Sequence, residues 1–272
     1  VTEDWYFWSH RLSLARAAQK SGFQVTVLTR VNKYKDLIES EGFNLIPLEL
    51  VRSSKNIFVE LLCFLEIIKI FRREKPDIVH NVALKPILYG TWAARFSRVP
   101  CVVNLFAGIT TKFHAKKWKS IILGTLVDLV FRFGFWNNNA YAIFQNSFDR
   151  KAFLDKNLLL EENTGIICGS GVSLTKFIDT PEPDGSPLVI LASRMLWDKG
   201  VGEFVEAAKI LKNEKISCRM ILVGNPDPEN PVPLPKDLIL KWQSEGWIEW
   251  WEHREDMPEV FSGANIVCLP SY

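Results

Sequence analysis

The chain has 272 residues, of which 47% are hydrophobic and 24% are charged, a length that favours two domains with substantial cores. Its formal net charge of +2 and the lack of any lysine- or arginine-rich block exclude nucleic acid as an expected partner. The five cysteines and four histidines are too scattered to indicate a disulfide framework or a zinc site. We therefore interpret the cysteines as reduced core residues.

Both ends of the sequence are unusual for a complete domain. The chain opens at Val1 in a polar turn and stops at Tyr272 after a strand-like run, whereas a doubly wound domain normally opens with a strand. We expect most of a first strand to be missing. Neither a secretory signal nor an apolar run long enough to span a bilayer is present, so we expect a cytoplasmic protein.

Helices and short strands alternate over the first two thirds of the chain, which implies parallel strands joined by right-handed crossovers. The spacing of apolar residues predicts helices over 9–21, 33–40, 56–73, 86–98, 116–133 and 147–155. Strands are predicted at QVTVLT, FNLIPLEL, DIVHNVA, PCVVNLF, AYAIFQ and TGIIC. Residues 1–178 are expected to form one Rossmann-like domain.

Residues 179–187, DTPEPDGSP, interrupt the alternation with three prolines and an Asp-Gly turn signal, which indicates a linker. The alternation then restarts in residues 188–272, with strands at LVILAS, CRMILVG, GWIEWWE and NIVCLP. We expect this second Rossmann-like domain to be incomplete and to leave some of its apolar strand residues poorly covered. Those residues are Val189, Leu191, Ile221 and Val267. The predicted fold class is α/β, with two such domains facing a cleft.

The loop after LVILAS holds Arg194 and Lys199 and opens onto an amphipathic helix. Backbone N–H groups at the start of a helix lack partners within the helix and carry the positive end of its dipole. We therefore predict that Arg194, Lys199 and Gly200 bind a diphosphate. The alternative is that both side chains are solvated loop cations.

Several segments resemble the retaining, nucleotide-sugar-dependent glycosyltransferases of family 4, which have the GT-B fold. SRMLWDKGVGEFVEAA resembles the donor-diphosphate loop, IICGSGVSLTKF the interdomain linker, and ANIVCLPSY the strand before the donor-site acidic motif. DWYFWSHRLSLARAA, DIVHNVALKPILYGTWAAR and IFQNSFDRKAFL resemble members that build bacterial lipopolysaccharide or capsule on lipid carriers.

The resemblance implies transfer of a hexose or N-acetylhexosamine from a nucleotide diphosphate sugar, with UDP as the expected nucleotide, to a glycan or polyprenyl-linked acceptor. It implies no cofactor and no metal, because the departing phosphate can itself accept the acceptor's proton. The family's two donor-site glutamates would follow Tyr272, so we expect the chain as given to be inactive. A sugar-nucleotide epimerase of the same fold and a noncatalytic nucleotide-binding scaffold are the alternatives.

Ligands of parallel sheets bind beyond the carboxyl ends of the strands, so residues that follow strands are the candidates for the cleft. His80 is the candidate catalytic residue, because the family has a histidine near this position; a buried strand histidine is an equal alternative. The other candidates for contacts with donor or acceptor are His10, Asn81, Lys85, Gly108 and Gly224. For both glycines an ordinary turn is the alternative.

Residues 114–136 combine Lys116, Lys117 and Lys119 with an apolar stretch that contains Trp118. Such a segment suits an anionic membrane surface, which would place the protein on the inner face of the plasma membrane. A core helix with solvated lysines at its start is an equal alternative.

Overall fold

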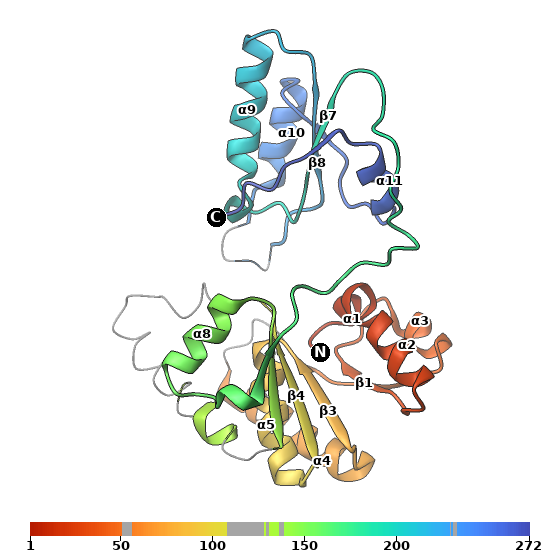
Figure 1. Ribbon diagram of the computed structural model, residues 1–272, viewed down its shortest axis with the longest axis vertical. Helices are drawn as coiled ribbons and strands as arrows, with labels where there is room; N and C mark the ends of the chain where they lie inside the picture. The colour runs from red at the N-terminus through yellow and green to blue at the C-terminus, as the bar shows by residue number, and fades with distance from the viewer. Residues whose placement is uncertain (51–55, 108–127, 129–130, 136–138, 229, 231–232) are drawn as a thin grey trace. The chain divides into compact units, whose positions relative to one another are not determined.

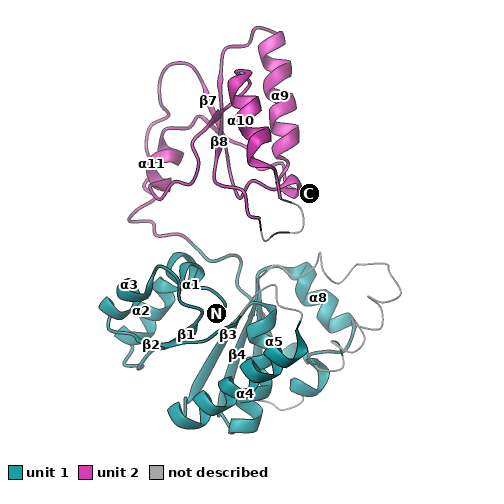
Figure 2. Ribbon diagram, turned by 180° about the vertical axis from the view of Figure 1, so that it is seen from behind, with its two compact units in different colours: residues 1–171 teal, residues 172–272 magenta. Residues whose placement is uncertain are grey.

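The computed structural model describes residues 1–50, 56–107, 128, 131–135, 139–228, 230 and 233–272. It divides into two compact units, Val1–Gly171 and Val172–Tyr272 (Figure 2). Residues 179–187, which we predicted as a linker, belong to the second unit. The side chain of Asn265 donates to the Glu182 carboxylate and to the Pro183 carbonyl oxygen, both at 3.0 Å, so this stretch is tied to its own unit.

The first unit alternates helices and parallel strands in the predicted order (Figure 1). Its helices are α1 (Asp4–His10), α2 (Leu12–Lys20), α3 (Lys35–Ser40), α4 (Ile57–Glu74), α5 (Leu84–Ser97), α8 (Ser147–Asp155) and the 3-10 turn η1 (Glu161–Asn163). Its strands are β1 (Thr26–Thr29), β2 (Asn44–Pro47), β3 (Ile78–Val82), β4 (Cys101–Phe106), β5 (Ala140–Phe144) and β6 (Thr164–Ile166).

These strands form two parallel sheets, one in the order β1-β2 and one in the order β3-β4-β5-β6. Residues Val1–Asp4 run beside the end of β1, because Arg30 donates its N–H to Thr2 and Asp4 donates to Arg30. The carboxyl ends of β3 to β6 lie at one edge of the larger sheet. The residues that follow these strands are therefore brought together there.

The single helix that we predicted over 9–21 is wrong in one respect, because it is two helices separated at Arg11. The backbone of Arg11 has φ −125° and ψ −11°, outside the helical region. The Arg11 side chain is only 9% exposed. The break turns this arginine inward, which a continuous amphipathic helix would not do.

The second unit contains a parallel sheet in the order β10-β7-β8-β9. Its strands are β7 (Leu188–Ala192), β8 (Arg219–Val223), β9 (Glu249–Trp250) and β10 (Ile266–Val267). Its helices are η2 (Trp197–Lys199), α9 (Val201–Asn213), α10 (Lys236–Ser244) and α11 (Met257–Ser262). Helices α9 and α10 cover one face of the sheet and α11 the other (Figures 1 and 2).

Alternating residues of β7 and β8 build a separate core on each face of this sheet. Val189, Leu191 and Leu222 pack with residues of α9 and α10, whereas Ile190 and Ile221 pack with Val260 of α11. Our expectation of poor coverage is therefore wrong for Val189, Leu191 and Ile221, which are at most 9% exposed. It is confirmed for Val267, which is 46% exposed on the outer strand β10.

All five cysteines are free, but only Cys63 is buried and Cys168 is exposed, so our interpretation of all five as core residues is wrong for Cys168. Among the helices that the structure describes, none has both the length and the apolar character needed to cross a bilayer.

Candidate functional site

The loop between β7 and α9 is held in shape by the loop that follows β8. Ser193 donates its N–H to Val223 and Met195 donates to Asn225, both at 3.0 Å. The two loops touch at Gly224, where an added Cβ would lie 1.9 Å from the Ser193 carbonyl oxygen. Gly224 also has φ +128°. This position requires glycine for both space and backbone conformation, so Gly224 is a structural support of the loop.

Arg194 and Lys199 differ in their present partners. Arg194 Nη1 forms an ion pair with Asp227 Oδ2 at 2.7 Å, and the Arg194 side chain is 46% exposed. Lys199 is half-buried and forms no ion pair with any described residue. Both cations belong to the same short loop, and Asp227 is the only described carboxylate paired with either of them.

Gly200 joins η2 to α9 in a left-handed conformation, with φ +70°. An added Cβ would lie 2.2 Å from the Pro270 carbonyl oxygen, so the residues after β10 pack directly on this junction. Helix α9 has no side-chain cap at its start. The first N–H groups of a helix have no backbone partner within it, so an anion beside Lys199 would meet those of α9 except the N–H of Glu203, which bonds to its own carboxylate.

His80 lies in the middle of β3 and keeps more than a third of its surface exposed. The protein atoms packed around the ring and, to a smaller extent, the Arg11 guanidinium lower the pKa of His80 to about 4. The imidazole is therefore neutral at pH 7. In that form it can donate one hydrogen bond and accept another, but it cannot supply a positive charge.

His10 ends α1 and is exposed. Its ring stacks on Tyr6 with 4.5 Å between ring centroids, and Nδ1 lies 2.6 Å from the Ser9 hydroxyl oxygen. Partial burial and the nearby Arg11 charge lower the pKa of His10. His10 and His80 thus share Arg11 as a neighbouring cation.

Two other candidates are engaged with neighbouring elements. Asn81 is buried, and its Nδ2 donates to Asn104 Oδ1 on β4 at 2.9 Å. Its amide lies under α5, because a Cβ added to Gly90 would be 2.0 Å from Asn81 Oδ1. Lys85 is half-buried and forms an ion pair with Glu60 of α4 at 2.7 Å. Both side chains therefore connect α5 to the structure around it.

Gly108 and nearly all of the 114–136 segment, including Lys116, Lys117, Trp118 and Lys119, lie outside the described residues. Within the part of the chain that is described, no group of three or more His, Cys, Asp or Glu side chains is placed to hold a metal ion.

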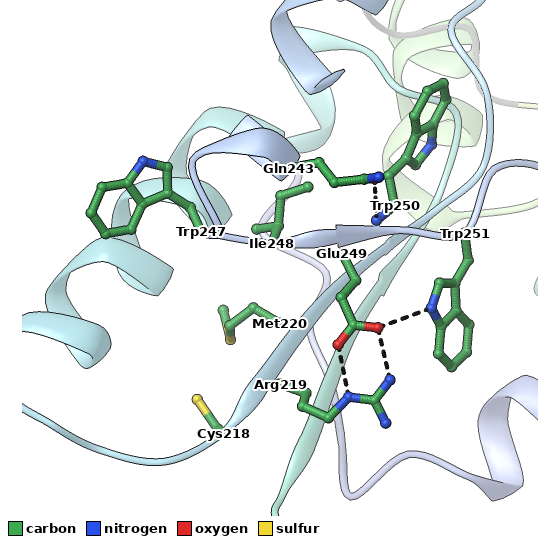
Figure 3. A pocket seen from close by; sticks show the side chains of 10 residues that line it. Cys218, Arg219, Met220, Gln243, Trp247, Ile248, Glu249, Trp250 and Trp251 are labelled. Atoms are coloured by element: carbon green, nitrogen blue, oxygen red, sulfur yellow. Dashed lines mark hydrogen bonds and ion pairs between the residues drawn. The ribbon is translucent and has the colours of Figure 1, made fainter. Parts of the chain in front are cut away.

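A pocket of about 450 Å³ lies along β9, the outer strand of the second sheet (Figure 3). Arg219 and Glu249 face each other in it through two contacts of 2.7 Å. Arg219 pairs in register with Leu188, at the opposite end of β7 from the 193–200 loop. The charges in this pocket satisfy each other, and none of the predicted site residues lines it, so it is not our candidate site.

Sequence reasoning missed one residue at these positions. Asp227 lies in the proline-rich loop after β8, and no local pattern indicated that it pairs with Arg194.

Comparison with known proteins agrees with this architecture. Residues 1–137 match the family model "Glycosyl transferase 4-like", and residues 186–272 match "Glycosyl transferases group 1". The N,N'-diacetylbacillosaminyl-diphospho-undecaprenol alpha-1,3-N-acetylgalactosaminyltransferase of Campylobacter jejuni is 26% identical over 276 residues, which cover 96% of this chain and 70% of the relative.

Solved structures share the fold at lower sequence identity. The Anabaena protein Alr3699/HepE, in complex with UDP and glucose, has a TM-score of 0.68 and 15% identity, with 97% of this chain and 71% of that chain covered. The UDP-GlcNAc 2-epimerase of Methanocaldococcus jannaschii has a TM-score of 0.57 and 13% identity, with 93% and 73% covered. The chain spans about 70% of the length of these relatives. It belongs to the glycosyl transferase 4-like family and has the GT-B fold.

Proposed function

We propose that this protein is a retaining glycosyltransferase that moves a hexose or N-acetylhexosamine from a UDP-sugar to a glycan carried on a lipid diphosphate. The loop between β7 and α9 is the observation that carries the proposal. It presents Arg194, Lys199 and the first N–H groups of α9 beyond the end of one strand, and this combination suits a diphosphate.

The expected chemistry follows from the charge that develops during transfer. As the glycosidic bond to the nucleotide breaks, negative charge accumulates on the departing diphosphate. Arg194 and Lys199 stabilise this charge, and a fixed loop does so without reorganising at the moment of reaction. The departing phosphate oxygen then accepts the proton of the acceptor hydroxyl. His80, which is neutral at pH 7, is proposed to hydrogen bond with the sugar.

Two names among the similar proteins support the choice of substrates. The Campylobacter jejuni relative acts on a diphospho-undecaprenol acceptor and forms an alpha linkage. Alr3699/HepE was solved with UDP and glucose. That this protein also uses a UDP donor and a lipid-linked acceptor, and that it retains the configuration of the sugar, is our proposal. Binding of residues 114–136 to an anionic membrane stays a prediction from the sequence.

The test is transfer of radiolabelled sugar by the purified full-length gene product, with a panel of UDP-sugars and lipid-diphosphate-linked glycans. Arg194→Met and Lys199→Met should each lower kcat/KM by about 10²- to 10³-fold, because one charge-assisted contact is removed from the transition state. The matched control is Lys209→Met on α9, whose ammonium instead pairs with Glu206, and its rate should stay within twofold of the parent. Equal rates in the parent and both loop variants would overturn the assignment.

The same assay separates the two alternatives. An epimerase converts the UDP-sugar into its epimer without any acceptor. Formation of a different UDP-sugar in acceptor-free reactions would therefore favour an epimerase over the proposed transferase. Saturable UDP binding without turnover of any donor and acceptor pair would instead favour a noncatalytic nucleotide-binding scaffold.

A further inference from the structure

Three tryptophans, Trp247, Trp250 and Trp251, line the pocket that runs along the outer strand β9 (Figure 3). Their indole N–H groups already donate to oxygen atoms of the protein, at 2.8 to 3.3 Å. A cation lies over each ring, 4.8 to 5.6 Å from its centroid, so the rings are held in place before any ligand binds. What they can still offer to a ligand is apolar ring surface.

The polar part of the pocket is an ion pair whose charges cancel. Arg219 donates through Nε and Nη2 to the two oxygens of Glu249, both at 2.7 Å, and each side chain is close to half exposed. Hydrogen bonding from Arg219 lowers the pKa of Glu249, so the carboxylate is charged at pH 7. Arg219 Nη1 has no hydrogen-bond partner among the described residues. The pair therefore presents N–H donors beside carboxylate lone pairs, without net charge.

Gln243, near the end of α10, completes the polar set. Successive N–H groups of a strand point to opposite sides, and because Trp251 donates its N–H to Leu222 of β8, that of Trp250 points away from the sheet. Gln243 Oε1 accepts from this N–H at 3.1 Å, which leaves the Nε2 donors without an acceptor among the described residues. An added β-strand would need the same backbone N–H, so the pocket does not suit a peptide.

These features together favour a neutral ligand with hydroxyl groups. The pocket volume of about 450 Å³ is in the range of small-ligand sites. A pyranose ring has an apolar C–H face that packs on an indole, and each of its hydroxyls donates one hydrogen bond and accepts others. A charged ligand would gain little from Arg219 and Glu249, because one partner repels what the other attracts.

We propose that this pocket is a sugar-binding site on the second unit, in which the indoles contact the sugar ring and Arg219, Glu249 and Gln243 bind its hydroxyls. Arg219 pairs with Leu188 at the start of β7, whereas the proposed diphosphate loop follows the other end of β7, so the two sites are distinct. The biological ligand rests on the proposed function, in which the acceptor carries a glycan. A second contact with that glycan would raise its effective concentration at the enzyme.

The test is titration of the full-length gene product, labelled with fluorotryptophan, with N,N'-diacetylchitobiose and detection by fluorine NMR. The signals of Trp247 and Trp251, assigned from Trp247→Phe and Trp251→Phe, should shift saturably. Arg219→Met should weaken this binding at least tenfold, because it removes the free donor and leaves the carboxylate uncompensated. The matched control is Arg16→Met, whose exposed guanidinium forms the same paired contact with Glu41 on the first unit. It should leave the affinity unchanged.

A second variant guards against loss of folding in Arg219→Met. Gln243→Glu changes an exposed side chain, keeps an acceptor for the Trp250 N–H and removes the amide donors. It should weaken disaccharide binding severalfold with an unaltered melting temperature. Absence of saturable shifts in the parent, or equal affinities in the parent, Arg219→Met and Gln243→Glu, would overturn the proposal.

Two further titrations define the ligand. Tighter binding of N,N'-diacetylchitobiose than of cellobiose assigns the site to N-acetylhexosamine units, and the reverse assigns it to hexose units; both results support the site. Displacement of the disaccharide by inorganic pyrophosphate would reveal an anion site and contradict the proposal. These measurements need no nucleotide. A gene product that binds disaccharide through Arg219 but transfers no sugar would therefore contradict the proposed function alone.

Discussion

His80 lies on β3 with a cation close enough to change its proton affinity. Because crowding of the ring and the Arg11 charge lower the pKa of His80 to about 4, the unfolded chain, with a histidine pKa near 6.5, binds the proton more readily than the folded one. The free energy of unfolding should therefore fall as the pH falls from about 6.5 to 4, and His80→Gln should flatten this dependence.

Urea unfolding of the parent and of His80→Gln at pH 7 and pH 5 checks this expectation. NMR gives an independent reading, since the His80 Cε1 proton should titrate near pH 4. A titration near pH 6.5 would show that neither the burial of the ring nor the Arg11 charge lowers its pKa.

At Gly224 the loop after β8 lies against the loop after β7, at the Ser193 carbonyl oxygen. Gly224→Ala should destabilise the second unit by roughly 3 kcal/mol. The new Cβ would clash with the Ser193 carbonyl oxygen, and the alanine would also carry the strain of a positive φ. Gly185→Ala is the matched control. Gly185 has φ +107° but nothing within 4 Å of an added Cβ, so about 1 kcal/mol is expected from strain alone. Equal urea midpoints for the two variants would contradict the close approach.

The sequence predicts some single residues better than others. Arg194 and Lys199 were predicted as diphosphate ligands because they lie in the loop between an apolar strand and the start of an amphipathic helix, and the start of a helix attracts anions. Asp227 was not, since its partner is 33 positions away and the pairing depends on the path of a proline-rich loop. Asn81 was predicted to line a cleft from its place at a strand end, whereas the alternation of faces along β3 turns it under α5.

At the scale of elements, the junction between β3 and α5 contains a strained backbone. Ala83 has φ +75° and ψ 161°, a region that is occupied almost exclusively by glycine. Ala83→Gly should therefore raise the free energy of unfolding of the first unit by about 1 kcal/mol. Chemical denaturation detects a change of this size. A loss of stability would mean that the methyl group contributes more through packing than the backbone conformation costs.

Strands and long helices were predictable because their apolar periodicity extends over more residues than the few by which their ends are uncertain. The expected helix over 56–73 is α4, Ile57–Glu74, and the run LVILAS contains β7. Breaks and short elements were not predictable. The residues around Arg11 have helical periodicity on both sides, so only the buried environment of its side chain favours the interruption. The strand β9 has two residues although its apolar run is longer, because tertiary pairing with β8 sets its length.

At the scale of the whole molecule, each unit has its own cores. We therefore expect two transitions in differential scanning calorimetry of the chain. UDP should raise only the transition of the second unit, where the diphosphate loop lies. At a hundredfold excess over its Kd the ligand contributes about 2.7 kcal/mol, a shift on the order of 10 °C for a unit of this size.

Arg194→Met should abolish this shift and leave the other transition in place. A nucleotide that moves both transitions equally, or only the one belonging to the first unit, would contradict our placement of the donor site.

The ion pair between Arg194 and Asp227 means that the proposed diphosphate loop carries its own competing anion. A tethered carboxylate acts at an effective concentration of the order of millimolar or higher, whatever the composition of the surrounding solution. Chloride or another small anion would have to displace the Asp227 carboxylate while making a single contact, so its binding would gain little free energy. A diphosphate bound in the proposed site would contact Arg194, Lys199 and the start of α9 together, and these contacts would offset the loss of the internal pair. We therefore expect the Asp227 carboxylate to make the proposed site selective for multivalent anions over small monovalent ones.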